Sequence, residues 1–276
     1  MSAELSQSLL SGPLSAADID EAARRIAPVV SPSPLDYSDR LSAAIGSDVY
    51  LKREDLLSVR SYKVRGAYNL LMQLSDAELA AGVVCSSAGN HAQGFALACR
   101  SMGVHGRVYV PAKTPKQKRD RIRYHGGEFI ELIVGGATYD LAAAAARADV
   151  VSTGATLVPP YDDLRTMAGQ GTIAVEILDQ LDGEPDLVIV PVGGGGCIAG
   201  VTTYLAERTT NTSVLGIEPA GAAAMIAALA AGGPVTLDVI DQFVDGAAVM
   251  RAGELTYRAL SAAGDMVSVV PVDEGA

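Results

Sequence analysis

The hydrophobic residues of this chain gather into short continuous runs, and these alternate with longer stretches of helical spacing. The run Leu187-Val-Ile-Val-Pro-Val192 is apolar throughout, as is typical of a strand that is covered on both faces. After Ser15, a candidate N-cap, apolar residues recur at Ile19, Ala22, Ala23 and Ile26, which indicates one buried face of a helix. The chain therefore mixes strands and helices along its whole length.

The order of these elements predicts the fold class. We expect strands at Val49–Lys52, Val83–Ser86, Val108–Val110, Phe129–Val134, Leu187–Val192, Val214–Glu218 and Val267–Val270. We expect helices at Lys63–Gln73, Ala92–Ser101, Lys116–Tyr124, Tyr139–Ala148, Met167–Gln180 and Ile198–Glu207. Strands and helices that alternate in this way form parallel sheets with helices on both faces. The sequence thus predicts an α/β fold, and without a low-complexity linker any two domains should be interleaved.

Length and charge narrow the class of protein. The chain has 276 residues, of which 49% are hydrophobic, so it is not disordered and can form one large or two modest domains. With 21 basic and 32 acidic residues its net charge is −11, which argues against nucleic acid and anionic membranes as partners. Basic residues between positions 113 and 123 recur three and four apart, which favours a solvated helix face over a nucleic-acid site.

The cysteines and apolar stretches bear on location. Three cysteines, Cys85, Cys99 and Cys197, are too few and too far apart for a disulfide framework, which favours a reducing cytoplasm. Glu4 stands where an export signal would carry basic residues. The longest uncharged stretch, Pro219–Leu237, is rich in Ala and contains a Gly-Gly-Pro that would end a helix. We expect a soluble cytoplasmic protein.

Two strand-to-helix junctions carry candidate chemistry. Cys85-Ser-Ser-Ala-Gly-Asn-His91 and Gly193-Gly-Gly-Gly-Cys197 each follow a predicted strand and open a predicted helix. Such a turn presents unpaired backbone N–H groups and the positive end of the helix dipole, so it can bind an anion such as phosphate. A tight turn that only packs on the sheet is the alternative. Neither junction matches a dinucleotide fingerprint or a P-loop, and Lys63 taken alone is typical of a surface lysine.

Three motifs in combination resemble a known family. They are Ser61-Tyr-Lys-Val-Arg-Gly-Ala67, Ser86-Ser-Ala-Gly-Asn-His-Ala-Gln-Gly94 and Pro191-Val-Gly-Gly-Gly-Gly196. In this order the chain resembles the pyridoxal phosphate (PLP) enzymes of fold type II, and within them the biosynthetic threonine dehydratases. Serine dehydratases and serine racemases are close relatives. Shorter matching pieces are Tyr50–Asp55, Pro159–Asp162 and Gly169–Thr172.

The resemblance implies a role for each matching residue. Lys63 would bond covalently to PLP and act as the catalytic base, and Asn90 would hydrogen-bond the ring hydroxyl of the cofactor. The cofactor phosphate would be held by backbone N–H groups of Gly193, Gly194, Gly195, Gly196 and Cys197. The substrate carboxylate would be held by the segment Ser87, Ala88, Gly89, Asn90 and His91. The implied reaction is a β-elimination that turns L-threonine into 2-oxobutanoate, a precursor of isoleucine, and ammonia.

Departures from the family pattern leave alternatives open. Racemases of the family carry a serine where this chain has Ala88, so racemisation is disfavoured. The divalent-metal pattern begins at Glu218-Pro219, but no carboxylate occurs at 221–224, so we expect no divalent metal there, although a monovalent ion is possible. An L-serine dehydratase and an inactive truncated chain remain as alternatives.

The resemblance also implies the organisation of the whole protein. We expect a large PLP-binding domain from residues 1–65 and 156–276, with a small mobile domain, residues 66–155, inserted in it. The family's serine for the pyridine nitrogen lies beyond the equivalent of Ala276, as does the regulatory domain of the allosteric members. The resemblance therefore implies that the sequence is truncated at its C-terminus. Relatives are homodimers or homotetramers.

Overall fold

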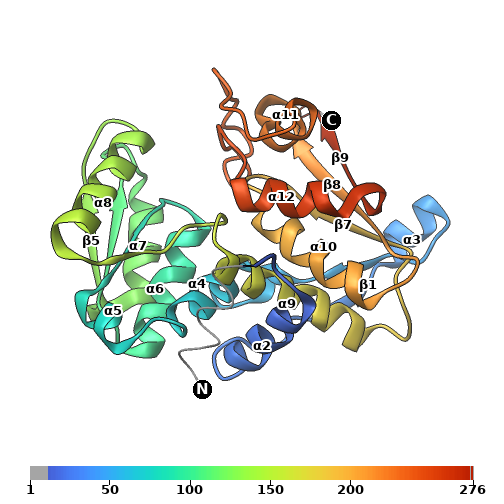
Figure 1. Ribbon diagram of the computed structural model, residues 1–276, viewed down its shortest axis with the longest axis horizontal. Coiled ribbons are helices and arrows are strands. Elements are labelled where there is room, and N and C mark those ends of the chain that lie inside the picture. The colour runs from blue at the N-terminus through green and yellow to red at the C-terminus, as the bar shows by residue number, and fades with distance from the viewer. Residues whose placement is uncertain (1–11, 274, 276) are drawn as a thin grey trace.

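A parallel four-stranded sheet forms one half of the molecule in the computed structural model, which describes residues 12–273 and 275 (Figure 1). Its strand order is β5-β4-β3-β6. Along β3, Val83 and Cys85 face the apolar cluster of α6 and α7, whereas Val84 faces Ala146 of α8. This alternation follows from the two-residue period of a strand and explains why Val83, Val84 and Cys85 are all apolar. The elements are β3 (Val83–Ser86), β4 (Gly106–Val110), β5 (Ile130–Val134), β6 (Thr156–Leu157), α5 (Asp76–Ala81), α6 (Asn90–Met102), α7 (Lys116–Gly126), η2 (Gly127–Phe129) and α8 (Tyr139–Thr153).

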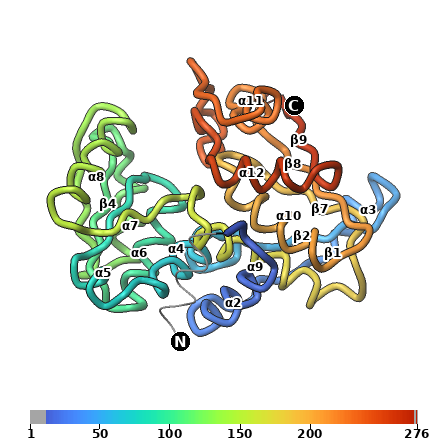
Figure 2. The backbone as a smooth tube through the Cα atoms, viewed as in Figure 1, coloured from blue at the N-terminus to red at the C-terminus, as the bar shows by residue number. Residues whose placement is uncertain are grey.

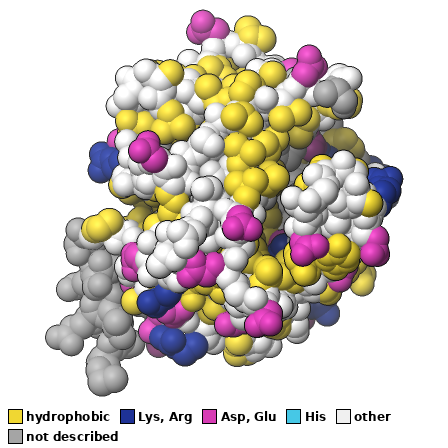
Figure 3. Space-filling model, turned by 90° about the vertical axis from the view of Figure 1, so that its right-hand side faces the viewer, with side chains coloured by type: hydrophobic (Ala, Val, Ile, Leu, Met, Phe, Trp, Pro, Cys, Tyr) yellow, Lys and Arg dark blue, Asp and Glu magenta, His cyan; other side chains and the backbone are white. Residues whose placement is uncertain are grey.

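A parallel three-stranded sheet, in the order β7-β8-β9, forms the other half. Val190 is buried against the helices on one face, while Leu187 and Ile189 on the other face are 49% and 59% exposed. The expectation that this strand is covered on both faces is therefore wrong. Figure 3 views the molecule from this side and shows apolar side chains gathered on it. The elements are β7 (Leu187–Pro191), α10 (Gly196–Arg208), β8 (Ser213–Pro219), η3 (Ala220–Ala222), α11 (Ala224–Ala231), α12 (Glu254–Ala263), η4 (Gly264–Met266) and β9 (Val267–Val272).

Three helices connect the halves. They are α2 (Ala16–Ile26), α4 (Lys63–Leu71) and α9 (Leu164–Gln180). Helix α4 packs against α6 on one side and α9 on the other, and α9 packs against α10. The approach is close because Gly94 and Gly169 face the backbone of α4; a Cβ on Gly94 would lie 2.6 Å from the nitrogen of Val64.

A two-stranded sheet of β1 (Leu35–Tyr37) and β2 (Tyr50–Lys52) is antiparallel, so the expectation of parallel sheets is wrong for this pair. Its strands flank α3 (Asp39–Ile45), and η1 (Glu54–Leu56) follows. The connection, residues 38–49, contains only the short helix α3 and does not cross over to the start of a parallel strand. The chain instead reverses its direction at this point.

The α/β class is confirmed, as are the predicted strands and helices, with shifted ends. Ser15 caps α2 through a capping box with Asp18. Helices α6 and α10 begin at Asn90 and Gly196, two residues before the predictions, because their first turns are polar or glycine-rich and carry no apolar period. Strands β1 and β6 and helices α3, α5, α11 and α12 were not predicted.

Some expectations lie beyond what the structure tests. Glu4 and Ala276 lie outside the described residues. Within residues 12–273 and 275, no helix is both long and apolar enough to cross a membrane. The division into residues 66–155 and the remainder stays a prediction.

Candidate active site

Lys63 is the first residue of α4, and its side chain is half-buried. Its Nζ donates a hydrogen bond to the carbonyl oxygen of Pro160 at 2.9 Å and lies 5.2 Å from the ring centre of Tyr62. Burial disfavours the charged amine and lowers the pKa of Lys63 to about 8, although the nearby Cys197 thiol acts in the opposite direction. Lys63 is therefore not the ordinary surface lysine that its type alone would suggest.

The segment Ser87–His91 forms the start of α6. The hydroxyl oxygen of Ser87 accepts from the nitrogen of Gly89 at 3.2 Å, Ala88 packs at the edge of the apolar cluster around β3, and Asn90 is exposed. Within the described part of the chain, the N–H groups of Ala88, Asn90 and His91 have no hydrogen-bond acceptor. The turn thus presents several free donors at a helix N-terminus.

The side chain of His91 is buried and neutral. Its Nε2 lies 2.8 Å from the carbonyl oxygen of Val158, so Nε2 carries the proton and donates it. Burial, together with the charge of Lys63, lowers the pKa of His91 to about 3. The imidazole therefore anchors the start of α6 and adds no charge near Lys63.

The glycine turn Gly193–Gly196 connects β7 to α10. Gly195 is the N-cap residue and has φ +92°, a left-handed conformation that favours glycine. A Cβ on Gly195 would lie 2.8 Å from Oγ1 of Thr256, which donates to the carbonyl oxygen of Gly194 at 2.7 Å. Among the residues described, no acceptor receives a hydrogen bond from the N–H groups of 193–197. This turn is a rigid cluster of donors suited to a phosphate.

One short segment contacts all three features. The carbonyl oxygen of Val158 binds His91, that of Pro160 binds Lys63, and Tyr161 packs on Gly194 and Gly196. Figure 2 shows this stretch of the chain crossing from β6 to α9 between the two sheets. The two junctions and the lysine, separate in sequence, are therefore assembled into one site.

Three contributors to this site had no predicted role. Tyr161 fills the space beside the glycine turn, and its hydroxyl donates to the carbonyl oxygen of Arg251 at 3.2 Å. The motif Pro159–Asp162 pointed to this segment, and Asp162 accepts from the nitrogen of Leu255 at 2.8 Å at the start of α12. Thr256 gave no sequence signal, because its role depends on a contact 62 residues away along the chain.

Comparison with known proteins decides the family. The family model described as pyridoxal-phosphate dependent enzyme matches residues 26–276. The chain belongs to this family. The predicted fold class and the predicted cofactor are thereby confirmed at family level. The site suits the cofactor, because an amine of lowered pKa lies beside a turn whose unpaired N–H groups can bind a phosphate.

Individual relatives of this PLP-dependent chain are named as a threonine dehydratase, a threonine deaminase and a serine racemase. It is 81% identical, over its full length, to "L-threonine dehydratase biosynthetic IlvA" of Mycobacterium tuberculosis H37Rv, and it spans 65% of that relative's length. Among solved structures, threonine deaminase isoform 2 of Solanum lycopersicum is 38% identical with a TM-score of 0.85, covering 94% of this chain and 77% of its own. Maize serine racemase is 32% identical with a TM-score of 0.88, covering 96% and 78%.

The Glu218-Pro219 motif has a structural role. Both carboxylate oxygens of Glu218 accept from the start of α11, from the nitrogens of Met225 at 2.8 Å and Ile226 at 2.9 Å. The described residues contain no group of three or more His, Cys, Asp and Glu side chains arranged to hold a metal. The expectation that no divalent metal binds here stays a prediction.

The lowered pKa of Lys63 gives a testable pH dependence. With a pKa of about 8, roughly one-tenth of the amine is neutral at pH 7, against roughly 0.03% for an ordinary lysine. Only the neutral amine is nucleophilic, so covalent attachment of PLP should accelerate with rising pH through about 8 and level off above it. Borohydride reduction at timed intervals, followed by peptide mass spectrometry, would measure this. A rate that still rises steeply at pH 10 would contradict it.

Proposed function

We propose that this chain forms the catalytic part of an L-threonine dehydratase, which converts L-threonine into 2-oxobutanoate and ammonia for isoleucine biosynthesis. The observation that carries the proposal is the Lys63 amine, with its pKa of about 8, held beside two clusters of unpaired backbone N–H groups. A substrate with one carboxylate and a cofactor with one phosphate require two such clusters. The 81% identity to a threonine dehydratase supports the choice of substrate.

The residues of the chain divide the work of binding between the two junctions. Backbone N–H groups of Gly193, Gly194, Gly195, Gly196 and Cys197 would hold the phosphate of PLP. The segment Ser87, Ala88, Gly89, Asn90 and His91 would hold the substrate carboxylate, through the unpaired N–H groups of Ala88, Asn90 and His91. The Asn90 side chain would bind the ring hydroxyl of the cofactor. One cluster would fix the cofactor and the other the substrate, so that the Cα–H bond of the substrate can be presented to Lys63.

Lys63 is the proposed base. PLP, when bound, supplies an electron sink for the charge that develops at Cα. The neutral Lys63 amine takes the proton from Cα, and the hydroxyl group at Cβ leaves with a proton as water. Rearrangement and hydrolysis of the unsaturated amino acid then give 2-oxobutanoate and ammonia. Burial raises the pKa of the Cys197 thiol to about 12, so the thiol is neutral, as is His91. The basic amine of Lys63 therefore has no charged side chain of either residue beside it.

The wider organisation is part of the same proposal. The segment 66–155 would move as a small domain against 1–65 and 156–276 and close over the substrate. A homodimer or homotetramer, which the family resemblance of the sequence implies, belongs to the proposal. A cytoplasmic location is supported by Cys85, Cys99 and Cys197, which are all buried free thiols.

Kinetics on two amino acids test the proposal. We expect kcat/KM for 2-oxo acid release to be at least about tenfold higher for L-threonine than for L-serine, because one methyl group in a fitted pocket is worth about 1–3 kcal/mol. A preference for L-serine would favour a serine dehydratase. Formation of D-serine would favour a racemase, which Ala88 in place of serine argues against. PLP binding with no turnover of either amino acid would contradict the proposal.

A further inference from the structure

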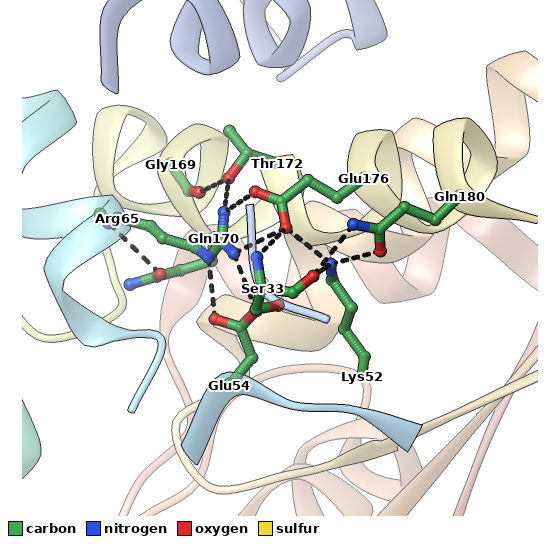
Figure 4. Close-up of polar contacts among 10 residues, drawn as sticks. Ser33, Lys52, Glu54, Arg65, Gly169, Gln170, Thr172, Glu176 and Gln180 are labelled. Carbon is green, nitrogen blue, oxygen red and sulfur yellow. Dashed lines mark hydrogen bonds and ion pairs between the residues drawn. The ribbon is translucent and has the colours of Figure 1, made fainter. Parts of the chain in front are cut away.

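Arg65, two residues after Lys63, is fully buried and pairs with two carboxylates at once (Figure 4). Its Nε and Nη2 donate to the two oxygens of Glu54, both at 2.8 Å. Its Nη1 and Nη2 donate to the two oxygens of Glu176 at 2.5 and 2.9 Å. Paired, planar contacts of this kind are the strongest hydrogen bonds that a protein makes. They hold the guanidinium in one orientation.

A second cation completes the group. Nζ of Lys52 lies 2.7 Å from Glu176, and the hydroxyl of Ser33 donates to Glu54 at 2.6 Å. The four charged side chains, which we call the Arg65 cluster, are Lys52, Glu54, Arg65 and Glu176. Each of them is at most 14% exposed. Two positive and two negative charges cancel, so the cluster is buried without a net charge.

The cluster holds the first turn of α4 in place. Tyr62, the N-cap residue, makes no side-chain capping bond, so Arg65 supplies the attachment of this turn to η1 and α9. On the other sides, a Cβ on Gly94 would lie 2.8 Å from the carbonyl carbon of Lys63, and one on Gly169 would lie 2.5 Å from the oxygen of Arg65. The backbone that carries Lys63 is thus fixed from three directions.

The side chains that face Lys63 from other elements are neutral. They are Cys197 from α10 and His91 from α6, with Tyr62 on its own helix. Burial raises the pKa of both Tyr62 and Cys197, so neither is ionised near pH 7. Glu54 and Arg65 act with opposite signs on the Cys197 thiol. The pKa of Lys63 itself is set by burial and by the Cys197 thiol, so the cluster acts on Lys63 through the backbone of α4.

We propose that the Arg65 cluster is a positioning device for Lys63, which fixes the place of the amine by holding the first turn of α4. This inference rests on the proposed role of Lys63. Removing one member of the cluster frees this turn to move relative to η1 and α9. The amine is then displaced from the position at which it meets the cofactor, so it reacts more slowly.

Two variants of the cluster test this. In the full chain, the rate of PLP attachment to Lys63 is followed from pH 6 to 10 by borohydride reduction and peptide mass spectrometry, and the plateau rate at high pH is compared. For Glu176→Gln, which breaks the pairing of Arg65 with α9, we expect the plateau rate to fall by about tenfold or more, and for Lys52→Met by a smaller factor. Of the contacts of Arg65, Thr172→Val removes only a 3.1 Å hydrogen bond, and it should leave the plateau rate in place.

Arg107→Met is the matched control, because it breaks a comparable pair, Arg107 with Asp149 at 2.6 Å, on β4. It should lower the unfolding temperature without lowering the plateau rate of PLP attachment. Plateau rates equal to that of the parent in both cluster variants would overturn the inference and leave the cluster a structural role only. If Glu176→Gln does not fold, the Lys52→Met variant alone tests the inference, because Glu176 stays paired with Arg65 when Lys52 is replaced. A parent chain in which PLP never attaches to Lys63 would instead overturn the proposed role of Lys63.

Discussion

Replacement of Lys63 with alanine is expected to abolish covalent PLP attachment and to lower 2-oxobutanoate formation by about 10³-fold or more. The variant removes both the amine that bonds to the cofactor and the base that takes the Cα proton. The fold should persist, because the one hydrogen bond that the side chain donates, to Pro160, ends on a backbone carbonyl. The visible absorbance spectrum with PLP, before and after L-threonine, measures both effects together.

Lys116→Ala is the matched control for this experiment. Lys116 is also the first residue of a helix, α7, but its side chain is 82% exposed and pairs only with Asp120 in the next turn. Its loss should leave the spectrum and the turnover unchanged. A visible cofactor band in Lys63→Ala, with PLP recovered on another lysine after borohydride reduction, would show that Lys63 is not the attachment site.

Gly195→Ala is expected to weaken PLP binding by about 10–100-fold and to lower the unfolding temperature by several degrees. The left-handed φ of +92° costs a non-glycine residue about 1–2 kcal/mol, and the new Cβ would meet the side chains of Met225 and Thr256. Relief of that overlap must move either the turn or Thr256, which holds the carbonyl of Gly194. Cofactor titration by fluorescence and a thermal melt measure the two effects.

Gly232→Ala separates backbone strain from crowding. Gly232 caps α11 with φ +74°, and nothing lies within 4 Å of where its Cβ would be. This control should lose stability from the backbone term alone and bind PLP as the parent does. Equal losses of PLP affinity in both variants would contradict the view that the shape of the 193–196 turn holds the phosphate.

The sequence predicted those elements whose own residues carry the pattern of a strand, a helix or a turn. The strand Val83–Ser86 begins with three apolar residues and was predicted with the same bounds as the structure has. Four consecutive glycines identified the turn 193–196. Strand β6 has two residues and exists only because Thr156 and Leu157 pair with Val83 and Val84. Strand β1 likewise depends on its pairing with β2. No window of sequence contains such partners, so these strands could not be predicted.

The same limit applied to the site. Lys63 and the two junctions were found through motifs, but their assembly depended on the backbone of residues 158–161, whose carbonyls have no sequence signature. The Arg65 cluster was missed for a related reason. Glu54 and Glu176 lie 11 and 111 residues from Arg65, and a lone buried arginine looks like any surface arginine until its partners are placed.

The segment from Val158 to Tyr161 has a consequence for how the sequence can vary. Three peptide steps span at most about 11 Å, and within that span the chain meets His91, Lys63 and the glycine turn in succession. Two of these contacts use backbone carbonyls, which every amino acid supplies. Evolution can therefore exchange side chains at 158 and 160 more freely than it can insert or delete a residue between 158 and 161. The number of residues in this segment, more than the identity of its side chains, therefore sets the spacing between His91, Lys63 and the glycine turn.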